Sequence, residues 1–159
     1  MMRKIILAIV IQLITIELIA QTQIYDPNSN AKSDIENAVK LAQKEHKHVL
    51  VQIGGNWCPW CVKLHKYFQS DNDIKEIITN NYILVKVNYS KENKNADILR
   101  DLENPQRFGF PVLVILDSNG KRIHTQDSGL LESGNGYDSK KVIGFLKNWT
   151  PNSLISTSK

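Results

Sequence analysis

The sequence predicts a single α/β domain in which helices flank a central mixed β-sheet. Helical and strand-like segments alternate through the first two thirds of the chain, which favours parallel pairing of those strands. Nearer the C-terminus, residues 117–120 read Asp-Ser-Asn-Gly, a turn typical of an antiparallel hairpin. A length of 159 residues, with 42% hydrophobic and 23% charged residues, suits one globular domain.

Residues 1–20 have the pattern of a secretory signal peptide. Arg3 and Lys4 precede a mostly apolar run that contains Glu17 near its end. This run is shorter than the roughly 20 apolar residues that cross a bilayer as a helix. We therefore expect cleavage after Ala20 and an exported protein, periplasmic or secreted, with an uncleaved membrane anchor as the alternative. Disulfides persist in such compartments.

An extended segment, a helix and a strand are predicted to follow this leader. Residues 21–32 are polar and are predicted to be extended. Ser33 and Glu36 match a capping box, which predicts a helix that begins there and ends near Glu45. The short apolar run 48–53 then predicts a buried strand.

The spacing of apolar residues predicts the remaining elements. In order, they are a helix from residue 59, a short helix at 74–78, a strand at 82–89, a helix at 96–103, strands at 112–116 and 121–126, a mostly polar loop at 128–137, and a helix at 138–149 that Pro151 ends. We expect residues 33–150 to form the domain and residues 151–159 to form a tail.

Charge and cysteine content exclude several classes of protein. The formal net charge is +4, and no run of five basic residues occurs, so a nucleic-acid partner is not expected. The chain has two cysteines, Cys58 and Cys61. Two cysteines provide neither a disulfide framework nor a four-cysteine zinc site.

The two cysteines form a C-x-x-C motif between a predicted strand and a predicted helix, which is typical of a redox pair. Cys58 lies at the helix N-terminus, where free amides and the positive end of the helix dipole favour its thiolate. Pro59 falls at the first helical position, where its missing N–H costs nothing. Cys61 lies three residues after Cys58, close enough to form a disulfide with it.

Other uses of the pair have weaker support. A c-type haem site needs His after the second cysteine, but residue 62 is Val. His65 shares a helix face with Cys61, but the four histidines have no zinc-finger spacing. A metal held by ligands from distant loops and a purely structural disulfide stay open as alternatives.

From residue 33 to residue 150, the chain resembles the thioredoxin superfamily, and specifically its exported bacterial members. Residues 57–61 match the W-C-x-x-C motif, Phe110-Pro111 matches the cis-proline position, and Lys86 matches a lysine beneath the active site. The resemblance implies a thioredoxin-like fold. It also implies that Cys58 attacks a substrate disulfide and that Cys61 resolves the mixed disulfide.

The resemblance implies roles for the neighbouring residues as well. Pro111 would face Cys58 and keep the dithiol from capturing a metal, while the backbone of Phe110 would pair with an extended substrate segment. Trp57 is expected to pack beside the pair, and Trp60 to be exposed and to contact substrate.

The sequence departs from the family pattern at position 52, where Gln52 replaces a buried acid. A glutamine cannot take the proton of Cys61, so Lys86, His65 or water would do so, or resolution is slow. The Pro59-Trp60 dipeptide also differs from the Gly-Pro of thioredoxins and the Pro-His of strong oxidases.

Together these features predict a monomeric thiol–disulfide oxidoreductase that reduces protein disulfides outside the cytoplasm. Its redox-active group would be the Cys58–Cys61 disulfide, with no other cofactor and no metal, and a membrane protein would supply its electrons. A disulfide oxidase or isomerase is the alternative enzyme. A metal-binding or redox-regulated adaptor module is the alternative from another class.

Overall fold

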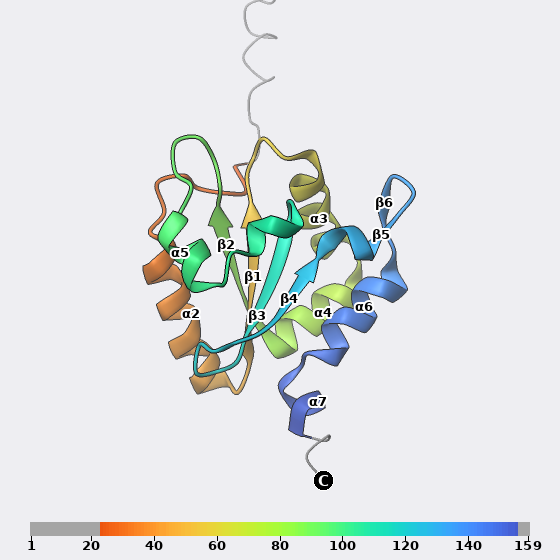
Figure 1. Ribbon diagram of the computed structural model, residues 1–159. Helices are drawn as coiled ribbons and strands as arrows, with labels where there is room; N and C mark the ends of the chain where they lie inside the picture. The colour runs from red at the N-terminus through yellow and green to blue at the C-terminus, as the bar shows by residue number, and fades with distance from the viewer. Residues whose placement is uncertain (1–22, 156–159) are drawn as a thin grey trace, which may run out of the picture.

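The computed structural model describes residues 23–155 and contains a mixed four-stranded sheet (Figure 1). The predicted signal peptide lies outside the described residues. The strands are β1 (His48–Gly54), β2 (Tyr82–Asn88), β3 (Val112–Leu116) and β4 (Arg122–Asp127), in the order β2-β1-β3-β4. Strand β1 is parallel to β2 and antiparallel to β3, and β3 is antiparallel to β4. The predicted mixed sheet is confirmed.

Helices cover both faces of the sheet. They are α2 (Ala31–Glu45), α3 (Pro59–Ser70), α4 (Asn72–Asn81), α5 (Ala96–Asp101), α6 (Ser139–Asn148) and α7 (Pro151–Ile155). Helices α2 and α5 lie on one side of the sheet, and α3, α4 and α6 lie on the other (Figure 1). Each face therefore has its own hydrophobic core.

Strand β1 is central and entirely buried, and its side chains alternate between the two cores. Val49, Val51 and Ile53 pack toward α2 and α5, whereas Leu50 packs toward α3 and α4. Gln52 shares the parity of Leu50, so a polar side chain lies on the face that α3 covers. The strand thus places the buried side-chain amide of Gln52 beneath α3, the helix that carries the C-x-x-C motif.

The start of α2 differs from the capping box that the sequence predicts. The helix begins at Ala31, and the side chain of Asn30 accepts a hydrogen bond from the Ser33 amide at 3.1 Å. Asn is among the best N-cap residues. The earlier start also buries Ala31 in the core beneath α2. Ser33 consequently lies within the first turn.

The C-terminal region has more regular structure than the sequence predicts. The expected loop at 128–137 contains the 3-10 helix η3 (Ser128–Leu131) and a small hairpin of β5 (Glu132–Ser133) and β6 (Gly136–Tyr137). Asp138, where the sequence predicts the last helix to begin, caps α6 by accepting a hydrogen bond from the Lys141 amide at 3.0 Å. The expected tail begins with a helix, α7, because proline suits a first helical turn as well as it ends a preceding helix.

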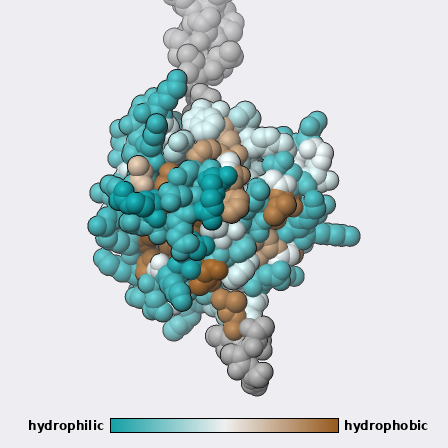
Figure 2. Space-filling model, in the orientation of Figure 1, coloured by the Kyte–Doolittle hydropathy of each residue, from teal (hydrophilic) through white to brown (hydrophobic). Residues whose placement is uncertain are grey.

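Hydrophilic residues cover most of the face shown in Figure 2, and hydrophobic residues occur there in small, separate groups. Within residues 23–155, no helix is both long and apolar enough to cross a membrane.

Candidate functional site

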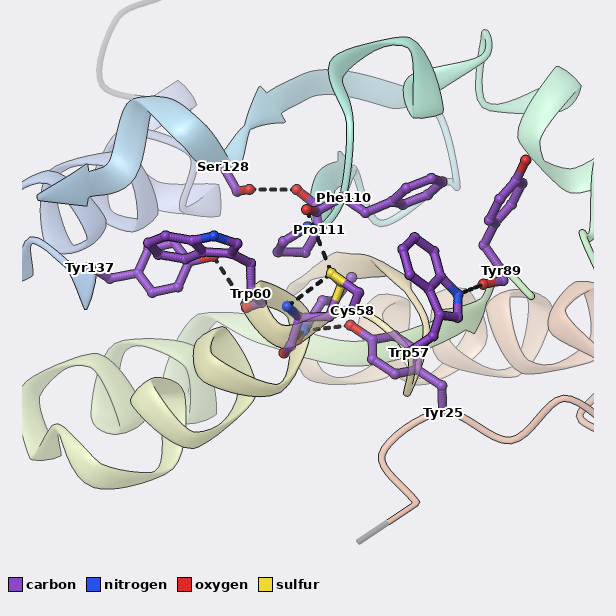
Figure 3. The surroundings of a disulfide bond; sticks show 11 residues. Tyr25, Trp57, Cys58, Trp60, Tyr89, Phe110, Pro111, Ser128 and Tyr137 are labelled. Carbon is purple, nitrogen blue, oxygen red and sulfur yellow. Dashed lines mark hydrogen bonds between the residues drawn. A yellow bond between two sulfur atoms is a disulfide. The ribbon is translucent and has the colours of Figure 1, made fainter. Parts of the chain in front are cut away.

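Cys58 and Cys61 form a disulfide just beyond the C-terminal end of β1, where the chain enters α3 (Figure 3). Their Cα atoms are 5.2 Å apart. Cys58 is 4% exposed and Cys61 is fully buried, so a reaction partner can approach only the first sulfur. This asymmetry matches the attacking and resolving roles that the resemblance implies for the two residues.

The start of α3 favours a negative charge on Cys58. Cys58 is the N-cap residue, and its sulfur accepts a hydrogen bond from the Cys61 amide at 3.2 Å. Pro59 occupies the first helical turn, as predicted. In the reduced protein, this amide and the positive end of the helix dipole stabilise the Cys58 thiolate relative to its thiol.

The Phe110–Pro111 segment lies across the disulfide. Its peptide bond is cis, and the Phe110 carbonyl oxygen lies 3.6 Å from the sulfur of Cys58. On the other side of the proline, the hydroxyl of buried Ser128 donates to the Pro111 carbonyl at 2.5 Å. Gly109, with a φ of 87°, allows the chain to turn just before this segment.

Three aromatic side chains form a wall on one side of the disulfide (Figure 3). Phe110 stacks on Tyr89 at 4.6 Å between ring centroids and meets Trp57 edge-on at 5.7 Å. The indole N–H of Trp57 donates to the Tyr89 carbonyl at 2.6 Å. We call these three residues the aromatic wall. Beside it lies an open cavity of about 460 Å³, lined by Trp57, Tyr89 and the loop that follows Tyr89.

The two tryptophans of the motif lie on opposite sides of the disulfide, and Trp60 is less exposed than the sequence predicts (Figure 3). Trp57 is 57% exposed and meets Phe110 edge-on. Trp60 is half-buried on the other side of the disulfide, edge-on to Tyr137 at 5.5 Å and beneath the Lys63 amine at 4.1 Å. The β5–β6 hairpin brings Tyr137 to this position, and it covers the ring that would otherwise face solvent.

No motif in the sequence indicates that Tyr25 belongs to the site. Its side chain is 1% exposed and packs with the two cysteines (Figure 3). Asn56 anchors its backbone, accepting from the Tyr25 amide at 3.0 Å and donating to the Tyr25 carbonyl at 2.7 Å. A lone aromatic residue in a polar segment was the only signal available.

Gln52 lies beneath the first turn of α3 and is fully buried. Its side-chain amide donates to the Tyr25 hydroxyl at 2.7 Å and to the Cys61 carbonyl at 3.4 Å. It therefore links the N-terminal segment to the first turn of α3. Being uncharged, it neither accepts a proton from Cys61 nor repels a thiolate there.

Lys86 is the neighbour of Gln52 across the parallel β1–β2 pair. Its amine lies 2.8 Å from Nδ1 of His65 on α3. Burial lowers the pKa of Lys86, and burial together with the nearby Lys86 amine lowers the pKa of His65. Lys86 and His65, two of the candidate proton acceptors for Cys61, are therefore in contact with each other.

Metal ligands do not gather in the described part of the chain: no three His, Cys, Asp or Glu side chains lie close enough together to hold an ion.

Comparison with known proteins agrees with this fold. The chain is 25% identical, over 92 residues, to "Disulfide bond reductase DsbH" of Chlamydia pneumoniae, a match that covers 54% of this chain and 55% of the relative. The chain thus spans about half the length of that reductase. A crystal structure titled as a disulphide isomerase from Xylella fastidiosa Temecula1 superposes with a TM-score of 0.72 at 23% identity, covering 81% of this chain and 98% of the other.

A thioredoxin-fold protein from Helicobacter pylori superposes with a TM-score of 0.54 at 17% identity, covering 84% of this chain and 86% of the other. Both superpositions support the fold. A family model described as thioredoxin-like matches residues 30–118, more than half of the chain. This span includes the C-x-x-C motif and the Phe110–Pro111 segment that lies across it. The chain therefore belongs to the thioredoxin-like family.

Proposed function

We propose that the protein is a thiol–disulfide oxidoreductase that reduces protein disulfides through Cys58 and Cys61. One observation carries this proposal: the sulfur of Cys58 lies at the N-terminus of α3, 3.6 Å from the Phe110 carbonyl and next to the aromatic wall. The sulfur that is favoured as a thiolate therefore faces backbone and aromatic groups that an extended peptide can bind.

The reaction balances as two exchanges of a disulfide bond. The Cys58 thiolate attacks one sulfur of the substrate disulfide, and the other substrate sulfur leaves as a thiolate and takes a proton from water. Cys61 then attacks Cys58, which releases the second substrate sulfur in the same way. The substrate gains two electrons and the cysteine pair loses them, so a dithiol donor must reduce the pair after each cycle.

The direction of net exchange is the part of this proposal most open to test. The relative in Chlamydia pneumoniae is named a disulfide bond reductase, which supports reduction. Stabilisation of the Cys58 thiolate supports the opposite direction, because it stabilises the reduced pair and makes the disulfide a stronger oxidant. An oxidase or isomerase is therefore the second candidate.

An exported location also belongs to the proposal. The pattern of residues 1–20 supports export to a compartment where disulfides persist. A reductase in that compartment needs electrons from inside the cell, so we propose a membrane protein with a reactive dithiol as its donor.

Trapping the mixed disulfide tests the chemistry. Full-length protein with Cys61→Ser should accumulate a covalent complex with a test protein that has exposed disulfides, whereas Cys58→Ser should form none. Non-reducing electrophoresis and mass spectrometry would identify the complex. If only Cys58→Ser formed a complex, Cys61 would be the attacking residue and the proposal would be refuted.

The equilibrium potential of the pair against glutathione tests the direction. A value near or below about −230 mV is expected for a reductase, and a value near about −120 mV would identify a disulfide donor instead.

A further inference from the structure

We propose that the hydroxyl of Tyr25 donates a hydrogen bond to the thiolate of Cys61 in the reduced protein, which makes Tyr25 a positioning residue for the resolving sulfur. This inference rests on the proposed function, because it concerns the second of the two exchange steps. It assigns a role in the reaction to a residue that precedes the first helix of the domain.

The first support is that the hydroxyl of Tyr25 and the sulfur of Cys61 lie against the same glycine, Gly54. A Cβ atom placed on Gly54 would lie 2.5 Å from the sulfur of Cys61 and 3.0 Å from the hydroxyl of Tyr25. The two atoms therefore share the small space above Gly54 that its missing side chain leaves open. In Figure 3 the ring of Tyr25 extends from the N-terminal segment with its hydroxyl directed toward the disulfide.

The second support is the direction of the hydrogen bond from Gln52. The same amide nitrogen of Gln52 contacts the Cys61 carbonyl, which can only accept. This contact fixes the amide with its nitrogen toward Tyr25, so the phenol oxygen is the acceptor. Within residues 23–155 the hydroxyl makes no other hydrogen bond, which leaves its proton available for a sulfur that becomes negative.

The third support is that the phenol keeps its proton. Burial raises the pKa of Tyr25 and outweighs the hydrogen bond from Gln52, which lowers it; Tyr137 adds a smaller increase. The other titratable groups near Cys61 are Cys58 and the mutually paired Lys86 and His65. A neutral hydroxyl with a free proton thus lies beside Gly54 on the side where the Cys61 sulfur also lies.

The chemical consequence concerns the second exchange step. Cys61 gives up its proton to water and attacks the sulfur of Cys58 in the mixed disulfide. A Cys58–Cys61 bond forms, the bond to the substrate sulfur breaks, and that sulfur leaves with the electron pair and takes a proton from water. Burial alone would disfavour the Cys61 thiolate, and a hydrogen bond from Tyr25 offsets that effect.

The size of the effect follows from two opposing terms. Loss of a hydrogen bond to a charged group corresponds to a roughly tenfold lower thiolate fraction at a given pH. A more basic thiolate is also a better nucleophile, with a Brønsted coefficient of about 0.4–0.5, which recovers part of the rate. Tyr25→Phe should therefore slow the second step by roughly threefold at neutral pH, and the difference should close and then reverse once the pH is high enough to ionise Cys61 fully in both proteins.

A chromogenic disulfide separates the two steps. Full-length protein, reduced beforehand with a dithiol, reacts with dithiobis(nitrobenzoate): Cys58 releases the first nitrothiobenzoate and Cys61 releases the second. Stopped-flow absorbance across a pH series gives both rates. Tyr82→Phe is the matched control, because Tyr82 is also buried and its hydroxyl donates to the Leu146 carbonyl at 2.6 Å, at the far end of β2.

The expected result is a slower second phase in Tyr25→Phe alone at neutral pH, with an unchanged first phase and a difference that reverses at high pH, where the more basic thiolate reacts faster. An unchanged second phase, or equal slowing at every pH, would overturn the inference, as would the same slowing in Tyr82→Phe. If Tyr25→Phe does not fold, fluorotyrosine at position 25 replaces it. This more acidic phenol should speed the second phase at neutral pH. An unchanged second phase would overturn the inference.

The test also distinguishes this inference from the proposed function. A wild-type protein that resolves the chromogenic disulfide but reduces no protein disulfide would refute the proposed function and leave the role of Tyr25 intact. A wild-type protein that releases no second nitrothiobenzoate would overturn the role of Tyr25.

Discussion

Asn56 pairs with the backbone of Tyr25 through both ends of its side-chain amide. The amide oxygen accepts from the Tyr25 N–H at 3.0 Å, and the amide nitrogen donates to the Tyr25 carbonyl at 2.7 Å. The same oxygen also accepts from the Ile24 N–H at 2.9 Å. Because Asn56 lies two residues before Cys58, this pairing ties the N-terminal segment directly to the redox motif.

Asn56→Ala should lower the free energy of unfolding by about 1–3 kcal/mol, because it leaves half-buried backbone groups of Ile24 and Tyr25 without partners. Urea unfolding measures the change. Asn80→Ala, an exposed residue of α4, should alter stability by no more than about 0.5 kcal/mol. Equal effects of the two substitutions would contradict an anchoring role for Asn56.

Gly54→Ala should destabilise the oxidised protein by about 1–3 kcal/mol, because the new Cβ would lie 2.5 Å from the sulfur of Cys61. Gly144→Ala is the matched substitution, since a Cβ there meets no atom within 4 Å in the middle of α6. It should stabilise the protein by about 0.5–1 kcal/mol through higher helix propensity. Thermal unfolding of both variants checks the opposite signs.

Ser128→Ala should cost about 1–3 kcal/mol, because the Pro111 carbonyl would lose a buried hydrogen bond. We also expect weaker protection of the adjacent β3 amides in hydrogen exchange, since this bond connects η3 to the start of β3. Ser139→Ala removes a half-buried hydrogen bond to Asp71, remote from the disulfide, and serves as the control. Unchanged exchange in β3 would argue against the role given to Ser128.

Lys86→Met should raise the pKa of His65 toward its usual value of 6.5, because it removes the neighbouring positive charge. In the wild type, the lowered pKa means that the unfolded chain binds more protons than the folded protein just below pH 6.5. Stability should therefore fall as the pH decreases through that window, and less so in Lys86→Met.

NMR titration of the His65 ring and urea unfolding at several pH values measure these effects. Lys63→Met is the control, because the amine of Lys63 contacts Trp60 and not His65. A His65 titration that is the same in Lys86→Met and in the wild type would show that the two side chains do not interact in solution.

Phe110→Ala should lower kcat/KM for a protein disulfide by roughly two- to tenfold, because it removes the centre of the aromatic wall. The rate with a small chromogenic disulfide should change little, since such a reagent does not need the wall. Phe108→Ala is the control: Phe108 is exposed, and its ring contacts Arg107. Equal losses for both substrates would mean that Phe110 supports the cysteines and not substrate binding.

The sequence by itself determined the features that depend on neighbouring residues. Periodic apolar residues identified the strands of the main sheet and its principal helices, because burial of one face requires that spacing. The position of Cys58 before Pro59 predicted an N-cap sulfur that accepts from the helix amides, which the structure confirms. The Asp138 cap of α6 was predictable for the same reason.

Only the tertiary structure decided which distant residues meet at the disulfide. Tyr25 precedes Cys61 by a helix and a strand, and no local pattern indicates that its side chain packs with the two cysteines. The exposures of Trp57 and Trp60 depend on where Phe110 and Tyr137 fold back, and these contacts join residues more than 50 positions apart. The local spacing of apolar residues predicts which face of a helix or strand is buried. The packing of the whole chain determines which residues lie against that face.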